Sequence, residues 1–217
     1  MKKIAVLLSG SGFFDGSEIH ESVLAMLALS KLEAQYQCFA PNINQMHVVN
    51  HLSGEVAENE HRNVLVESAR IARGEIKSTD EVDTSIFDGL IIPGGFGAAK
   101  NLCNFAIKGS DCEVSPEVSE FITKFVEAEK PIGFICIAPI MIPRLYGEGA
   151  SGTIGNDFET AQAFNAMGGQ HKEANAQEII IDEERKLVST PAYMLAGSIA
   201  EVNIGIEKLV KKVLAMT

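Results

Sequence analysis

The sequence has little of what would organise a fold through covalent or metal cross-links. It contains no tryptophan, and its four cysteines (Cys38, Cys103, Cys112 and Cys136) have irregular spacing with no C-x-x-C pair. This pattern argues against a disulfide framework and against a structural zinc site, so we expect reduced thiols and no metal. Basic residues are also few: 18 Lys and Arg against 29 Asp and Glu give a net charge of −11. Because nucleic-acid binding requires a concentrated basic face, we expect no nucleic-acid partner.

Long hydrophobic runs are absent as well. The longest apolar stretch, 131–143, is too short to span a bilayer and has Pro139 inside it. The apolar run near the start of the chain ends at Ser9, which is typical of a first strand rather than of a secretory signal. We therefore expect a cytoplasmic protein that does not bind membranes.

The pattern that is present alternates short apolar runs with amphipathic segments, which predicts an α/β fold with a mostly parallel sheet. With 46% hydrophobic residues, and without a linker or an internal repeat, residues 1–217 are predicted to form one domain. The expected strands are 4–8, 36–40, 87–92 and 131–136, with a hairpin formed by 179–181 and 187–189. The expected helices are 17–31, 63–73, 116–130, 158–167 and 195–214, with a short helix near 138–139. The least regular part is 42–60, where a small strand at 48–49 is an option, as is another at 153–154.

Two motifs suggest cofactor or metal chemistry and do not meet its requirements. A dinucleotide fingerprint after the first strand would need its third glycine one residue before Gly16, and the second strand ends without a carboxylate. His47 and His51 have zinc-protease spacing, but the position that needs glutamate is Val48. We therefore expect no cofactor and regard these histidines as structural or surface residues.

Cys136 is the strongest candidate for chemistry. It lies where an apolar strand stops and a helix begins, in Gly133-Phe134-Ile135-Cys136-Ile137-Ala138-Pro139. Amides at such a helix start point at the sulfur and favour the thiolate, which predicts a lowered pKa. The alternative is a buried cysteine that acts as a small apolar residue, and spacing alone leaves the two interpretations about even.

Two further segments belong with this cysteine if it reacts. The loop Pro93-Gly94-Gly95-Phe96-Gly97 can bring backbone amides close to an oxyanion at the same sheet edge. Glu18, in the first turn of the first expected helix, either forms a capping box with Asp15 or places its carboxyl against Cys136. In the second arrangement it would have to be protonated and to donate a hydrogen bond to the thiolate. His20 lies two residues on, about 200° around a helix, and is not expected on that face.

Taken together, these motifs resemble the PfpI and deglycase branch of the class I glutamine amidotransferase-like superfamily. Within that branch the chain is similar to the ElbB family, the isoprenoid-biosynthesis-associated glyoxalases. The resemblance runs nearly end to end and rests on four stretches: Asp15–Glu21, Pro93–Leu102, Gly133–Pro139 and Thr190–Met194. It implies a flavodoxin-like three-layer sandwich, helices on both faces of the sheet, and a homodimer.

The resemblance also implies an active site and an activity. The implied catalytic residues are Cys136 and Glu18. The implied oxyanion and substrate-binding residues are Gly94, Gly95, Phe96, Ile137, Gly10, Asn101, Thr190 and Tyr193. The implied reaction converts glyoxal or methylglyoxal to the hydroxy acid without glutathione, or removes such adducts from proteins.

The chain departs from the resemblance at one position that matters. PfpI-type hydrolases have a histidine directly after the nucleophile, and this chain has Ile137. No histidine occurs around 153–157, and His171 is expected in a loop. Without an imidazole base, amide hydrolysis loses about 10²- to 10⁴-fold in rate. This disfavours a protease or glutaminase and leaves two hypotheses, a glyoxalase-type enzyme and a non-catalytic redox sensor or metabolite-binding protein.

Overall fold

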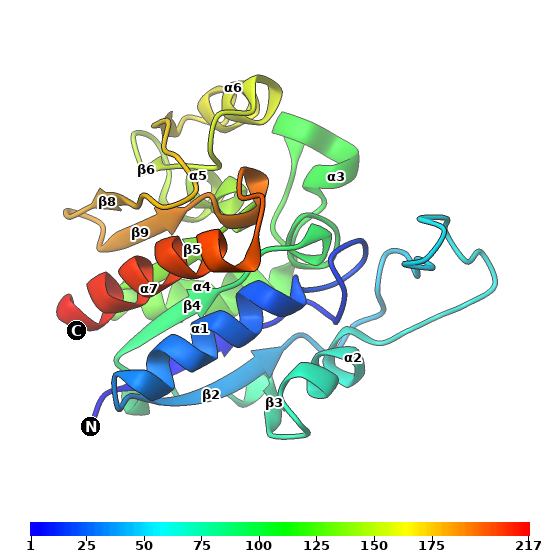
Figure 1. Ribbon diagram of the computed structural model, residues 1–217, viewed down its shortest axis with the longest axis horizontal. Helices are drawn as coiled ribbons and strands as arrows, with labels where there is room; N and C mark the ends of the chain where they lie inside the picture. Colours follow the sequence, from blue (N-terminus) through cyan, green and yellow to red (C-terminus); the bar gives the residue numbers. More distant parts are fainter.

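The computed structural model describes residues 1–217, and its main feature is a seven-stranded sheet between two layers of helices (Figure 1). The strands of this sheet are β1 (Lys3–Leu7), β2 (Gln35–Ala40), β3 (Ile76–Ser78), β4 (Gly89–Ile92), β5 (Ile132–Ile135), β8 (Ile180–Asp182) and β9 (Leu187–Thr190). Their order is β3-β2-β1-β4-β5-β9-β8, and every neighbouring pair is parallel except β8 and β9. The predicted flavodoxin-like α/β fold and its hairpin are confirmed.

The helices cover both faces because each strand alternates its side chains between them. They are α1 (Ile19–Lys31), α2 (Val64–Ile71), α3 (Phe105–Lys108), α4 (Pro116–Glu127), α5 (Ile142–Tyr146), α6 (Phe158–Ala166) and α7 (Ile199–Ala215). From β1, Ile4 and Val6 pack in the core shared with α1 and α7, which lie in front of the sheet in Figure 1. Ala5 and Leu7 point to the opposite core, which includes the phenylalanines of α4.

Several boundaries differ from those expected. Helix α1 begins at Ile19 rather than at Ser17, and α7 begins at Ile199 rather than at Leu195. The short strands β3, β6 (Ser151–Gly152) and β7 (Gln170–His171) were not predicted; β6 lies just before the strand expected at 153–154, and β7 contains the histidine expected in a loop. At 48–49 there is only an isolated bridge, Val49 with Val56. These pieces are too short to show a periodic pattern.

The carboxyl ends of β1 and β4 meet where the strand order reverses, which is the place where open α/β sheets bind ligands. The loops after these two strands are joined directly. The Glu18 amide donates to the Gly94 carbonyl at 2.9 Å, and the Gly97 amide donates to the Gly16 carbonyl at 2.8 Å. The start of α1 is therefore fixed against the glycine loop that follows β4.

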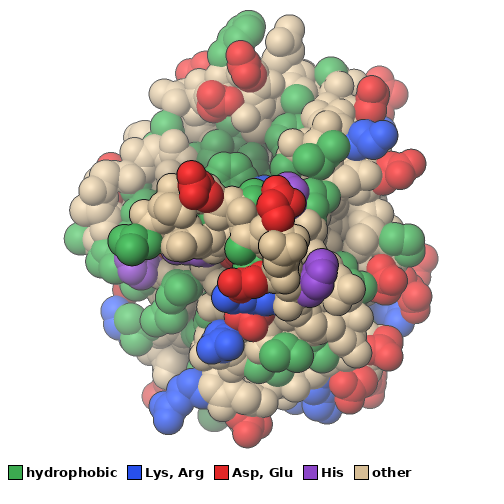
Figure 2. Space-filling view, turned by 90° about the vertical axis from the view of Figure 1, so that its right-hand side faces the viewer, with side chains coloured by type: hydrophobic (Ala, Val, Ile, Leu, Met, Phe, Trp, Pro, Cys, Tyr) green, Lys and Arg blue, Asp and Glu red, His purple; other side chains and the backbone are tan.

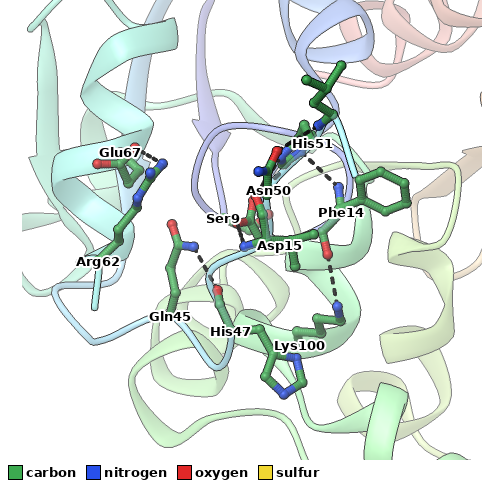
Figure 3. A network of polar contacts seen from close by, with 12 residues as sticks. Ser9, Phe14, Asp15, Gln45, His47, Asn50, His51, Arg62, Glu67 and Lys100 are labelled. Atoms are coloured by element: carbon green, nitrogen blue, oxygen red, sulfur yellow. Dashed lines mark hydrogen bonds and ion pairs between the residues drawn. The ribbon is translucent and has the colours of Figure 1, made fainter. Parts of the chain in front are cut away.

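A long loop, residues 42–62, is fastened beside this edge (Figure 3). The Phe14 amide donates to His51 Nε2 at 3.3 Å, and Lys100 Nζ donates to the Phe14 carbonyl at 2.9 Å. Buried Asp15 accepts a hydrogen bond from the Val49 amide at 2.6 Å. This network holds the loop that carries the neighbouring residue, Phe13.

His47 and His51 lie in this loop and not on a helix, so their spacing does not place them on one helical face. No group of three or more His, Cys, Asp or Glu side chains has the arrangement of a metal site. None of the helices combines the length and the apolarity needed to cross a membrane.

Candidate functional site

Cys136 stands on a strained elbow directly after β5. Its φ of 64° lies in the left-handed region, which non-glycine residues seldom adopt unless their surroundings impose it. The Cys136 amide donates to the Thr190 carbonyl at 2.9 Å, which ties the elbow to β9. A turn of 3-10 helix, Ala138–Met141, follows. The predicted strand-to-helix elbow is therefore present, and the cysteine side chain is buried at its tip.

The glycine loop makes room for this sulfur. A Cβ on Gly94 would lie 2.4 Å from the Cβ of Cys136 and 2.9 Å from its Sγ, so only glycine fits there. Gly95 has a φ of 90°, and a Cβ on it would lie 2.4 Å from the Glu18 amide nitrogen. The amides of Gly95 and Ile137 lie near the Cys136 sulfur and act to lower its pKa. Two backbone donors are thus close to the atom that would attack a carbonyl.

The carboxyl group beside Cys136 belongs to Glu21 and not to Glu18. Glu21 is fully buried in α1, and its carboxyl lies close enough to Cys136 to raise the pKa of the thiol. Its two oxygens also accept the Gly94 amide at 3.0 Å and the Tyr193 amide at 3.2 Å. Burial, and after it the charge of Glu18, raises the pKa of Glu21 to about 8. At neutral pH this carboxyl is protonated, as we expected of the group that touches the cysteine.

The expectation of a thiolate is not supported. Burial, and after it the negative charge of Glu21, raises the pKa of Cys136 well above its ordinary value. The amides of Gly95 and Ile137 act in the opposite direction but do not outweigh burial. The free protein therefore holds a neutral thiol beside a neutral carboxyl, since one small buried site cannot hold two negative charges.

Glu18 has a different position from the one we predicted. It is the N-cap of α1, and its Oε2 accepts the Glu21 amide at 2.7 Å. The predicted capping box with Asp15 does not form, because the helix begins after Glu18 and Asp15 binds the Val49 amide instead. The Glu18 side chain lines the same cavity as Cys136, so the two are brought to one site without the direct pairing that we expected.

This cavity has a volume of about 490 Å³ and opens at the carboxyl edge of the sheet. Its walls are mainly apolar, from Phe13, Phe96, Phe105, Ile137 and Met194. Its polar side chains are those of Cys136, Glu18, Asp157, Thr160 and Tyr193, with no lysine or arginine among the lining residues. In Figure 2, which looks onto this edge of the molecule, hydrophobic side chains gather in the hollow of the surface. The cavity therefore suits an uncharged ligand with an apolar part.

Four of the predicted binding residues lie outside the cavity wall. The Gly94 amide donates to Glu21 Oε2 at 3.0 Å. The Gly10 amide donates to the Ser68 hydroxyl at 2.8 Å. Buried Asn101 donates to the carbonyls of Ser9 and Asp15 at 2.8 Å and 2.9 Å. Thr190 supports the elbow through its carbonyl. These residues hold the loops around the site and do not line it, because their polar groups are used within the protein.

Sequence reasoning missed Glu21 and His20. Glu21 shares its spacing with the buried positions Ala25, Ala28 and Leu29 of α1, and that periodicity marks it as a buried acid. His20 was predicted to point away from the site. In the structure its Nδ1 lies 2.9 Å from the Tyr193 hydroxyl and 4.0 Å from Glu18 Oε1. The separation of about 200° holds only between two residues within one helix. Glu18 is the N-cap of α1 and has extended backbone, so this separation does not apply to it.

Comparison with known proteins finds relatives along nearly the whole chain, although no protein-family model matches. The chain is 42% identical over 224 residues to the rat ES1 protein homolog, mitochondrial, covering 99% of this chain and 84% of that protein. It is 42% identical to the human glutamine amidotransferase-like class 1 domain-containing protein 3, mitochondrial, covering 99% of this chain and 83% of that one.

Among solved structures, an isoprenoid biosynthesis protein with an amidotransferase-like domain from Ehrlichia chaffeensis superposes with a TM-score of 0.93. It is 37% identical, and the match covers 100% of this chain and 99% of that one. Glyoxalase III from Candida albicans has a TM-score of 0.62 and 13% identity over 99% of this chain and 97% of that one, which shows a common fold alone.

Proposed function

Because this chain belongs to the family of the ES1 and glutamine amidotransferase-like class 1 proteins, we propose that its cysteine site acts on small carbonyl compounds. Within that family we place it with the ElbB-type glyoxalases. The proposed reaction converts an α-oxoaldehyde to the corresponding hydroxy acid without glutathione. The observation that carries the proposal is Cys136 on its strained elbow, with a protonated Glu21 and two converging amides around the sulfur.

The first step forms a hemithioacetal. The Cys136 sulfur attacks the aldehyde carbon, and the thiol proton goes to the aldehyde oxygen, so the product is neutral. The amides of Gly95 and Ile137 stabilise negative charge on that oxygen as the bond forms. Glu21 donates a hydrogen bond to the sulfur while it carries charge. The thiol loses its proton as the sulfur attacks, and an aldehyde, unlike an amide, needs no leaving group to be protonated.

The second step moves hydrogen between the two carbons. Glu18, whose carboxylate faces the cavity, takes the proton from the carbon bonded to sulfur and gives it to the neighbouring carbon. The intermediate is an enediol and the product is a thioester of Cys136. Water then opens the thioester, which releases the hydroxy acid and restores the thiol. The sum is dicarbonyl plus water to hydroxy acid, and no external oxidant or reductant is consumed.

Amide chemistry is a weaker proposal, although the relatives are named for amidotransferases. The position after the nucleophile is Ile137, and the nearest later histidine, His171, accepts the Ile154 amide in another part of the chain. Cys136 therefore has no imidazole to protonate a leaving amine. Deglycation is a weaker proposal for the same reason, because it also requires a leaving amine to be protonated.

A second candidate function is binding of an uncharged metabolite without turnover. The neutral, buried thiol in an apolar cavity favours it, because such a thiol is poorly nucleophilic at rest. The same property disfavours the redox sensor, which needs an exposed thiolate. We also propose a homodimer in the cytoplasm, while the rat and human relatives are named as mitochondrial proteins. Sedimentation of the purified chain tests the dimer.

The experiment that tests the proposed function is product analysis with purified, metal-stripped protein in the absence of glutathione. Wild-type protein should form lactate from methylglyoxal, and Cys136→Ala should form none. The matched control is Cys38→Ala, another buried cysteine, which lies on β2 against Met26 rather than in the cavity. Equal activity of wild type and Cys136→Ala would refute the assignment. Saturable binding of methylglyoxal without product would favour the metabolite-binding alternative.

A further inference from the structure

Tyr193 connects the cysteine centre to the cavity wall. It lies in a 3-10 turn, Ala192–Met194, that follows β9, and Ala192 takes a φ of 44° in the left-handed region. The Tyr193 amide donates to Glu21 Oε1, so its backbone is held by the same carboxyl that contacts Cys136. Its side chain lines the cavity together with Cys136 and Glu18. The phenol is therefore positioned by the catalytic centre itself.

His20 continues this connection to solvent. Its Nδ1 lies 2.9 Å from the Tyr193 hydroxyl oxygen and 4.0 Å from Glu18 Oε1. The imidazole side chain is 49% exposed, which leaves its other nitrogen free to exchange protons with water. The three side chains thus form a chain of polar contacts from the cavity to the surface.

The proposed reaction leaves one proton without a carrier. The amides of Gly95 and Ile137 face the oxygen of the attacked carbonyl, and Glu18 handles the carbon-bound hydrogen. The oxygen of the second carbonyl must gain a proton when the enediol forms, and it keeps this proton as the hydroxyl of the product. Two side-chain hydroxyls line the cavity, those of Thr160 and Tyr193, and the Tyr193 hydroxyl is the one in contact with a histidine, His20.

We propose that Tyr193 is a catalytic residue whose hydroxyl gives a proton to the second carbonyl oxygen, and that His20 is the positioning residue that supplies that proton through Nδ1. This inference rests on the proposed function. As the enediol forms, the Tyr193 proton moves to the substrate oxygen and the Nδ1 proton of the imidazolium moves to the Tyr193 oxygen. When Glu18 protonates the second carbon, the hydroxyl proton of the first oxygen passes to water as the thioester carbonyl forms. His20 takes up one proton from water, so no proton is consumed overall. No electrons are gained or lost.

Proton transfer by Tyr193 and His20 depends on the ionisable groups around them. The ionisable groups that face it are Glu18 and Glu21 from the start of α1, with Cys136 deeper on the elbow. Burial, and after it the charges of these two glutamates, raises the pKa of Tyr193, so the phenol stays protonated. The proposed transfer requires a proton on Nδ1 of His20 and an intact phenol on Tyr193, so removal of either group should alter the pH profile of turnover.

The test is the pH profile of kcat for methylglyoxal in wild type, Tyr193→Phe, His20→Gln and the double variant. Tyr193→Phe should lower kcat by about 10²-fold, the lower range of general acid–base catalysis. His20→Gln should lower kcat less and should change the shape of the pH profile of kcat, because one proton-carrying group is removed. The double variant should be no slower than Tyr193→Phe, since His20 acts only through the phenol. His61→Gln, which removes an exposed histidine of the long loop, is the matched control.

Two readouts separate chemistry from folding and from the proposed function. The melting temperature and the rate of Cys136 alkylation should be the same in His20→Gln as in wild type. The substitution changes only a half-exposed side chain at the start of α1 and leaves the buried core intact. A His20→Gln profile identical to that of wild type, or independent losses in the double variant, would overturn the role of the pair and leave the proposed function intact. Absence of product with wild type would overturn both.

Discussion

The carboxyl of Glu21 lies beside the thiol of Cys136, and burial raises the pKa of both groups. Two acids that share a buried site cannot both ionise without a large electrostatic cost. The pair is therefore neutral in the free protein, and charge develops at the sulfur only when a substrate takes the thiol proton.

Glu21 should make the protein less stable as pH rises. Its folded pKa of about 8 lies above its ordinary value of 4.5, so the folded state holds this proton more tightly than the unfolded state does. The stabilising contribution is fully present below pH 4.5 and is lost progressively up to about pH 8. The size of this effect is on the order of a few kcal/mol.

The measurement is urea unfolding between pH 5 and 9 of wild type and Glu21→Gln. The variant loses one acceptor for a buried amide, which costs about 1–3 kcal/mol. It should also lose this share of the pH dependence, so the gap to wild type should narrow as pH rises. Parallel stability curves for the two proteins would contradict a raised pKa at Glu21.

Cys136 should react slowly with iodoacetamide at neutral pH and faster as pH rises, because its pKa is raised by burial and by Glu21. Site-resolved mass spectrometry separates its alkylation from that of the other three cysteines. In Glu21→Gln the rate above about pH 8 should exceed that of wild type, since the negative charge beside the sulfur is gone. Rapid, pH-independent alkylation of wild type would show a thiolate and contradict this account.

Gly94→Ala should disrupt the elbow. The added Cβ would lie 2.4 Å from the Cβ of Cys136 and 2.8 Å from the Ile135 carbonyl oxygen, and neither neighbour is a flexible chain end. We expect loss of turnover and a destabilisation of roughly 1–3 kcal/mol, as for other overpacked sites. Gly197→Ala, in open surroundings, should change neither. Thermal unfolding together with product formation measures both effects, and a fully active Gly94→Ala protein would refute the close approach.

The apolar cavity should favour dicarbonyls that carry an apolar group. Phenylglyoxal should have a higher kcat/KM than glyoxal, by about tenfold or more, because it buries its ring against Phe96 and Phe105. A dicarbonyl that bears a carboxylate should be a poor substrate, since Glu18 and Asp157 line the cavity without a compensating cation.

The matched variants for this prediction are Phe105→Ala and Leu52→Ala, the latter at a side chain that is 98% exposed on the long loop. Phe105→Ala should reduce the advantage of phenylglyoxal over glyoxal, and Leu52→Ala should leave it unchanged. Equal kcat/KM values for the two substrates in wild type would show that the aromatic walls do not contact the substrate.

The amino-acid sequence by itself determined the layers of this protein and the place of its nucleophile. Continuous apolar runs predicted strands buried on both faces, and an apolar run that stops at Cys136 before a helix predicted the elbow, since both signals are local along the chain. Only the tertiary structure decided which glutamate touches the sulfur. The Glu18 amide donates to the Gly94 carbonyl of a distant loop, and α1 begins directly after Glu18, so Glu18 caps the helix. Glu21 lies on the buried face of α1, and the packing of that face against the loop after β4 brings its carboxyl to Gly94 and Cys136.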